Sequence, residues 1–198
     1  MTSKQQNVCA VVIVHGQSEY ALINSIKSKL RVNLKVFSRD KGKTSIQING
    51  LSTIFENSIF KSKNKLLQEY PGIKKKKNKL DDFKIFTFMD VDDCSDISVK
   101  NNYLDGHLSD ISKHPLREYF YPIYCDENLE AVLDDVNFPF IAKTNRQKKK
   151  YIVVFDSVEQ IANEENIQDF CDKLKKSEKT NLEVLVKYML DHKFEIKS

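Results

Sequence analysis

Three aspartates directly follow a strongly apolar segment, and their type and spacing suit a hard metal ion. Residues 83–89 (Phe-Lys-Ile-Phe-Thr-Phe-Met) run straight into Asp90, Val91, Asp92 and Asp93. Alternate residues of an extended segment point the same way, so we expect Asp90 and Asp92 to face one ion together. Magnesium takes oxygen ligands and keeps several waters, so two or three carboxylates suffice. The alternative interpretation is a solvated loop whose aspartates cap a helix.

A second group of polar residues follows the first apolar run of the chain. Residues 8–14 are followed directly by His15 and Gly16, and Glu19 comes three positions after the glycine. In open parallel sheets, ligands bind at the carboxyl ends of the strands, so this group is expected beside the aspartates. Gly16 permits a sharp turn or a close backbone approach. Glu19 is either a further metal ligand or an ordinary charge at a helix N-terminus.

A third acidic group follows the segment 119–124. If that segment is a strand parallel to the others, Glu127 or Glu130 would close the metal site from a third side. The alternative is that both are acids in the first turn of the helix expected over residues 127–136.

Positive charge is clustered, although the formal net charge is only +4. Lysines fill positions 74–77, and residues 146–150 hold four further cations. Such runs are either solvated surface or contacts to a phosphate backbone. Backbone amides at the start of the helix expected over residues 44–55, together with Lys41 and Lys43, are a further candidate phosphate contact. The residues that we expect to bind nucleic acid are Lys41, Lys43, Lys74, Lys75, Lys148 and Lys149.

The elements that must position these residues alternate between strands and helices. This order predicts an α/β fold with a mostly parallel sheet of four or five strands, helices on both faces and C-terminal helices. Pro122 places the fourth strand near an edge. A capping box at residues 180–183 predicts the start of the last helix. The expected strands are 8–14, 34–37, 83–89, 119–124 and 151–155, and the expected helices before the last are 18–30, 44–55, 127–136 and 158–174.

Length and composition indicate one domain without a membrane span. The 198 residues suggest an α/β domain over 1–140 and a strand–helix extension over 141–198 that packs on it. No apolar run approaches the length a bilayer requires, and the N-terminal run is too short for a signal peptide. The four cysteines form no CxxC pair, which favours reduced thiols and a cytoplasmic location.

The combined pattern resembles the Toprim domain of topoisomerases, primases and overcoming-lysogenization-type nucleases. The similarity covers residues 8–130 and rests on Gly16-x-x-Glu19 and on Asp90-Val91-Asp92. The resemblance implies a nuclease that uses Mg²⁺ or Mn²⁺, with Asp90, Asp92, Asp93, Glu19 and Glu130 as metal ligands. Similar small phage-defence proteins of the abortive-infection type imply a role in defence, with nucleic acid and an ATPase protein as partners.

One residue departs from the family pattern. The glutamate expected before the glycine is His15 here. A histidine can serve as general acid or base near neutral pH, so the catalytic set would be His15, Glu19 and Asp90. The substitution equally suits a Toprim-like module that binds nucleic acid or regulates a partner without cutting. A phosphatase of the haloacid type also ends a strand in Asp-x-Asp, but that strand comes first in its chain, whereas here it comes third.

Overall fold

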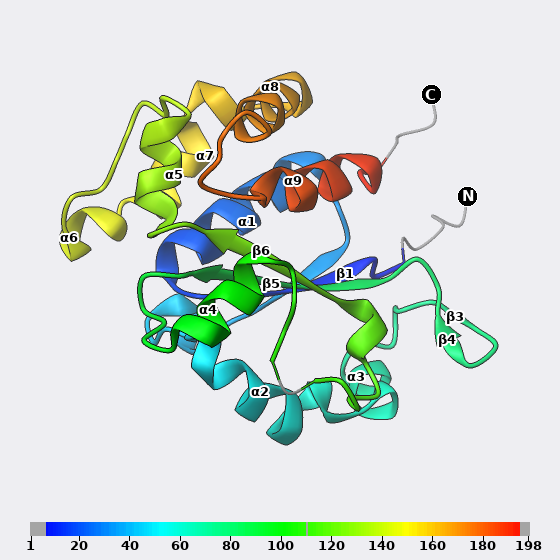
Figure 1. The fold of residues 1–198 in the computed structure, drawn as a ribbon. Coiled ribbons are helices and arrows are strands. Elements are labelled where there is room, and N and C mark those ends of the chain that lie inside the picture. Colours follow the sequence, from blue (N-terminus) through cyan, green and yellow to red (C-terminus); the bar gives the residue numbers. More distant parts are fainter. Residues whose placement is uncertain (1–6, 110, 195–198) are drawn as a thin grey trace, which may run out of the picture.

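Four parallel strands form the central sheet of this protein (Figure 1). The computed structural model describes residues 7–109 and 111–194. The strand order is β2-β1-β5-β6, and every neighbouring pair is parallel. The predicted α/β class, with helices around a parallel sheet and at the C-terminus, is confirmed. The strands are β1 (Ala10–Val14), β2 (Leu34–Phe37), β5 (Lys84–Asp90) and β6 (Phe120–Cys125).

Both faces of the sheet are covered, which explains why its central strands are mostly apolar. Ala10, Val12 and Val14 of β1 pack into one apolar cluster, and Val11 and Ile13 pack into the other. This alternation follows the two-residue period of a strand. The first cluster is completed by α1 (Gln17–Leu30), α5 (Leu129–Asp135), α7 (Tyr151–Ser157), α8 (Glu164–Leu174) and α9 (Leu182–Asp191). The second is completed by α2 (Leu51–Asn57), α3 (Lys63–Glu69) and α4 (Ile97–Leu104).

The residues after 140 share the core of the sheet. Their buried side chains, from Ala142 to Leu190, belong to the same apolar cluster as those of β1. Figure 1 shows α7, α8 and α9 on the face of the sheet that α1 also covers. Among the described residues, no helix combines the length and the apolar character needed to cross a bilayer.

The prediction of a strand over residues 151–155 is wrong, because this segment forms helix α7. Tyr151 and Phe155 lie one turn apart, are fully buried, and stack with ring centroids 4.6 Å apart. Ile152 and Val153 between them are 49% and 69% exposed. The β-branched residues favour a strand, but burial of the two rings on one helical face overrides that weak preference.

The helix expected over residues 44–55 begins only at residue 51. Residues 44–47, called the strap below, run without helix across the end of β1 and lead into a 3-10 turn, η2 (Ile48–Gly50). The Ile46 N–H donates to the His15 carbonyl at 2.8 Å, and the His15 ring donates back to the Ile46 carbonyl at 2.9 Å. These contacts with His15 replace the first turns of the expected helix.

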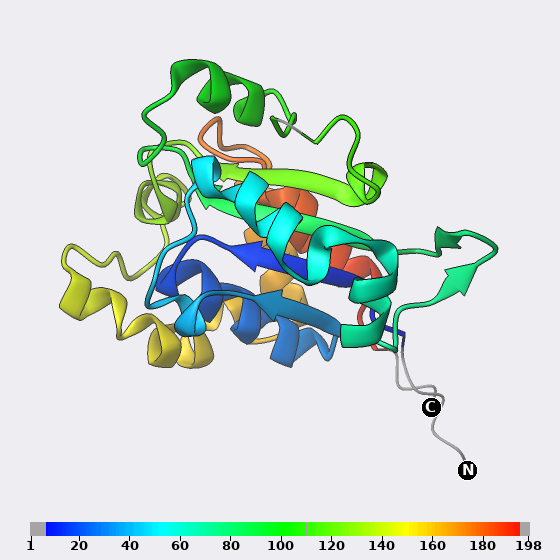
Figure 2. The same cartoon turned by 90° about the horizontal axis from the view of Figure 1, so that it is seen from below.

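The polar stretch 60–80 contains helix α3 and then a hairpin. β3 (Lys75–Lys76) pairs antiparallel with β4 (Lys79–Leu80). The hairpin, residues 74–80, projects from the end of the sheet where β5 begins (Figure 2). It is called the basic hairpin below.

β6 is an edge strand, as Pro122 predicted, and the start of α9 supports it. The Asn181 side chain accepts from the Tyr124 N–H at 2.9 Å and donates to the Pro122 carbonyl at 3.0 Å. The capping box is not formed as predicted: the N-cap is Asn181, which makes no capping bond, while the Thr180 hydroxyl accepts from the Leu182 N–H at 3.0 Å. The amide of Asn181 satisfies the strand edge instead of the helix end.

Gly42 allows the turn before the strap to lie against the start of α1. It ends the 3-10 turn η1 (Asp40–Gly42) with a φ of +84°, in the region that favours glycine. A Cβ at this position would lie 2.6 Å from the carbonyl oxygen of Gly16 and 2.7 Å from the Cα of Gln17. Both contacts are with backbone atoms, so neither backbone segment can move aside at low energetic cost.

Gly42→Ala is therefore expected to destabilise the fold by about 2 kcal/mol or more, through φ strain and backbone collision. Gly50→Ala is the matched control, because a Cβ there meets nothing within 4 Å and its φ is negative. Urea denaturation of both variants measures the difference. Equal stabilities would mean that the turn is not pressed against Gly16.

Candidate functional site

A cleft of about 750 Å³ opens at the carboxyl ends of the strands. It lies where β1 gives way to α1 and where β5 ends, so the predicted convergence of these two segments is present in the structure. The cleft is lined by His15, Gly16, Gln17, Ser18, Glu19, Gly42, Lys43, Ser45, Asp90, Asn145, Lys148 and Lys149.

Glu19 is buried at the start of α1. Gly16 is the N-cap, and the Gly16 N–H donates to the Glu19 carboxylate at 2.8 Å. The sequence prediction of an acid in the first helical turn is confirmed, but the residue is only 2% exposed. Glu19 also lines the cleft, so its position is compatible with both of the roles considered for it.

Glu130 joins the site from α5, whereas Glu127 does not. The Ser18 hydroxyl donates to Glu130 at 3.1 Å, and the Lys148 ammonium lies 2.8 Å from its second oxygen. Glu127 is exposed and contributes only its carbonyl, which accepts from Asp92 at 3.1 Å. Of these two acids, Glu130 is therefore the one that contacts residues of the cleft, through Ser18 and Lys148.

His15 is oriented by the strap. A carbonyl can only accept, so the Nδ1 that faces Ile46 at 2.9 Å carries a hydrogen. Nε2 then faces the carboxylates of Asp93 and Asp90, at 3.4 and 4.0 Å. A bare ring lone pair directed at two carboxylates would be repulsive. The geometry therefore calls for a proton or a cation between these groups.

The three aspartates do not share one extended segment, contrary to the prediction. β5 ends at Asp90, and the chain then turns, with the Cys94 N–H donating to the Val91 carbonyl at 3.3 Å. Asp90 is buried and accepts from the Leu129 N–H at 3.1 Å. Asp92 instead accepts from the Asn128 side chain. The turn brings Asp93, rather than Asp92, to His15.

Burial raises the pKa of both carboxyl groups at the centre of the cleft. Desolvation is the largest cause for Asp90, followed by the negative charges of Glu19, Asp92 and Glu130, and its pKa lies well above the ordinary range. The pKa of Glu19 is raised by burial too, although the charge of His15 opposes the shift.

Lys148 supplies positive charge to this cluster. Its partial burial opposes ionisation, but the hydrogen bond to Glu130 and the charges of Glu130, Glu19 and Asp90 raise its pKa overall. No sequence signal indicated this pairing, because Lys148 and Glu130 are on separate helices that only the fold brings together. Helix α6 (Asn145–Lys148) holds Lys148 at the cleft.

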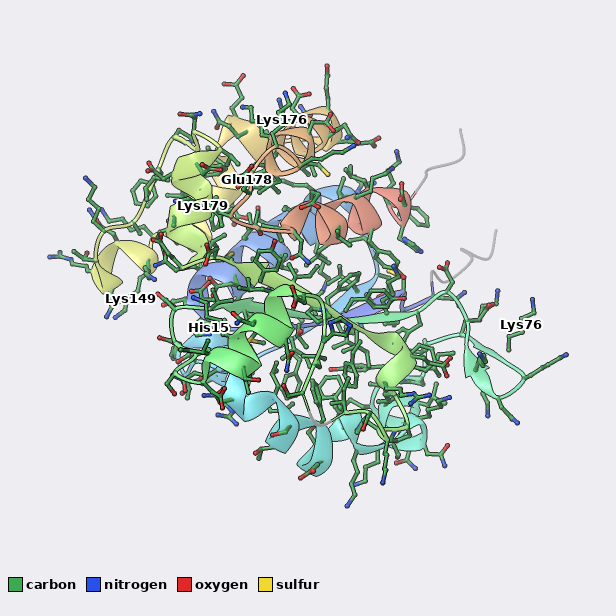
Figure 3. The ribbon with its side chains drawn as sticks, viewed as in Figure 1. His15, Lys76, Lys149, Lys176, Glu178 and Lys179 are labelled. Atoms are coloured by element: carbon green, nitrogen blue, oxygen red, sulfur yellow. The ribbon has the colours of Figure 1, made fainter. Side chains whose placement is uncertain are left out.

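The predicted phosphate-binding lysines fall into two groups. Lys43, Lys148 and Lys149 line the cleft, and Lys41 lies in the adjoining turn η1. Lys74 and Lys75 belong to the basic hairpin at the opposite end of the sheet. Figure 3 shows Lys76 of this hairpin far from both His15 and Lys149.

In the part of the chain that the structure describes, no three His, Cys, Asp or Glu side chains converge as a metal-binding group. The donor set nevertheless has the chemistry of a magnesium or manganese site, with the carboxylates of Asp90 and Asp93 beside the imidazole of His15.

Comparisons with known proteins add little to this geometry. No protein-family model matches the chain, and no curated protein sequence matches it. A solved structure, the C-terminal region of the Burkholderia pseudomallei OLD protein, is similar over 93% of this chain and 88% of that chain. The sequence identity is 11% and the TM-score is 0.30, a value too low to support an argument about this chain.

Asp90→Asn is expected to stabilise the metal-free protein at neutral pH. The folded-state pKa of Asp90 is raised, so the folded protein keeps a proton that the unfolded chain releases above about pH 4. Stability then falls as the pH rises from that point through the raised pKa. The variant removes this loss and keeps the oxygen that accepts from Leu129, so it should be more stable than wild type at pH 8.

Urea denaturation in EDTA between about pH 5 and 8 measures the effect. The exposed Asp105→Asn variant is the control and should follow the wild-type pH dependence. A pH slope that is as steep in Asp90→Asn as in wild type would show that Asp90 ionises normally.

Proposed function

We propose that this protein is a Toprim-type, divalent-metal-dependent nuclease that acts on the phosphodiesters of nucleic acid. One observation carries the proposal: His15, Glu19 and Asp90 line the same cleft as Lys43, Lys148 and Lys149. Buried acids suit a metal ion and exposed lysines suit a polyanion, and the two kinds of group meet at the carboxyl edge of a parallel sheet.

The residues that would hold the ion are Asp90 and Asp93, whose carboxylates lie 4.0 and 3.4 Å from Nε2 of His15. Glu19, Asp92 and Glu130 add negative charge close to Asp90.

The ion, when bound, would polarise the phosphate and lower the pKa of an attacking water. His15 would take the proton of that water, because Ile46 fixes its tautomer and leaves Nε2 facing the cleft. Lys43 and Lys149, both exposed at the cleft, would position the phosphate backbone. The Toprim resemblance extends the proposal to anti-phage defence and to an ATPase partner.

A second function has one observation in its favour. Lys148 already places an ammonium group 2.8 Å from Glu130, within electrostatic reach of Glu19 and Asp90. An internal cation of this kind can balance the acids without a metal. The chain would then be a Toprim-like module that binds nucleic acid or regulates a partner without cutting.

The two functions differ in what a metal does to stability. Manganese should raise the melting temperature of the wild-type protein and leave that of Asp90→Asn unchanged, because a ligand stabilises only the state that binds it. Lys148→Gln should strengthen the manganese effect if the ammonium competes with the ion. Scanning calorimetry with and without manganese measures both. No shift in wild type would favour the metal-free module.

Cleavage assays test the activity itself. Wild type should cut DNA or RNA with magnesium or manganese, and Asp90→Asn should lose at least about 100-fold of that rate. His15→Ala should lose about 100-fold or more, through loss of the acid–base group. Asp105→Asn should retain full activity. Full activity in Asp90→Asn, or no cutting of any substrate with candidate ATPase partners present, would overturn the nuclease.

A further inference from the structure

The basic hairpin carries an unusual concentration of lysines on a projecting element. Lysines occupy positions 74, 75, 76, 77 and 79, and all five are exposed. In the antiparallel pairing Lys76 lies opposite Lys79, so these two share one face of the ribbon. Figures 1 and 2 show the hairpin extending away from the helices that cover the sheet.

Two lysines of the hairpin are paired with acids. Lys74 pairs with Asp81 at 2.9 Å and Lys79 pairs with Glu118 at 3.2 Å. Lys75, Lys76 and Lys77 form no ion pair with any residue that the structure describes. Three adjacent cations on a projecting element repel one another.

The turn of the hairpin also holds a lysine in a strained backbone conformation. Lys77 has a φ of +55°, in the left-handed region that glycine or asparagine normally occupies in short hairpin turns. A side chain there costs about 1 kcal/mol. Observed strain of this kind often accompanies a binding function, and here it keeps a cation at the tip.

We propose that the basic hairpin is a DNA-binding arm that enters the major groove of a duplex outside the cleft. A two-stranded ribbon fits the major groove of B-form DNA, whereas the major groove of an RNA duplex is too narrow. The inference rests on the proposed function only in taking nucleic acid as the ligand. It adds the substrate class: duplex DNA.

The length of β5 sets the distance between the arm and the cleft. The strand runs for seven residues from Lys84, beside the hairpin, to Asp90 in the cleft. At about 3.3 Å per residue this separates the two by about 20 Å, or about six base pairs. Edge strand β2 runs in the same direction. Lys35 on this strand and Arg39, two residues after it, add positive charge between the hairpin and the cleft. A duplex must therefore extend beyond about six base pairs to reach both.

Fluorescence anisotropy on the full chain in EDTA tests this inference without any cleavage. The triple variant Lys75→Gln, Lys76→Gln, Lys77→Gln should bind a duplex of about 24 base pairs at least about tenfold more weakly than wild type. The slope of log affinity against log salt should fall by about 2 to 3. On a duplex of about six base pairs the two proteins should bind alike.

Two controls separate this effect from charge and folding. Lys173, Lys175 and Lys176 are exposed at the end of α8, and their triple glutamine variant should bind the long duplex as wild type does. Lys77→Gly relieves the strained turn, so it should weaken DNA binding while melting at or above the wild-type temperature.

Equal losses in the two triple variants would overturn the arm, as would an equal loss on duplex RNA or a loss confined to vesicles of anionic lipid. These results are independent of catalysis. If wild type cuts DNA but the hairpin variant binds normally, the arm fails and the nuclease stands. If the hairpin variant binds weakly but wild type never cuts, the nuclease fails and the arm stands.

Discussion

Asp90 and Glu19 are buried at the same edge of the sheet, with Glu130 and Asp92 close enough for the negative charges to raise the pKa of Asp90. Holding ionised carboxylates out of water is costly unless a cation or hydrogen-bond donors offset their charge. The backbone N–H groups of Gly16 and Leu129 supply part of that compensation. The remaining need for positive charge gives the cleft its chemistry.

Three sources of positive charge can meet that need, two from the chain and one from outside it. Lys148 reaches Glu130 from a short helix that follows the main α/β units. His15 turns its Nε2 toward Asp93 and Asp90 because the strap holds the other ring nitrogen. A metal ion is the third source in the function proposed here. The strap itself depends on Gly42, whose missing side chain lets two backbones touch. Local backbone geometry and site electrostatics are therefore coupled.

Positive charge outside the cleft is arranged by the direction of the strands. Parallel strands deliver the acids to one edge of the sheet, and the loop before β5 leaves the basic hairpin at the other edge. The sequence shows both lysine runs but not that a whole strand length separates them. Lys148 and Lys149 lie at the cleft, whereas Lys74 and Lys75 lie beyond the start of β5.

The positions of the central strands and their parallel direction were predictable from the residues alone. The apolar runs before His15 and before Asp90 determine two buried neighbouring strands, and hence the meeting of Glu19 with Asp90, because parallel strands end at one edge. Tertiary structure decided what local patterns could not. Tyr151 and Phe155 form a helix since their rings are buried on one face, and Ile46 leaves its expected helix to bond His15. It also decided that Asp93 faces His15 and that Lys148 meets Glu130, since both depend on turns and packing between segments distant in the chain.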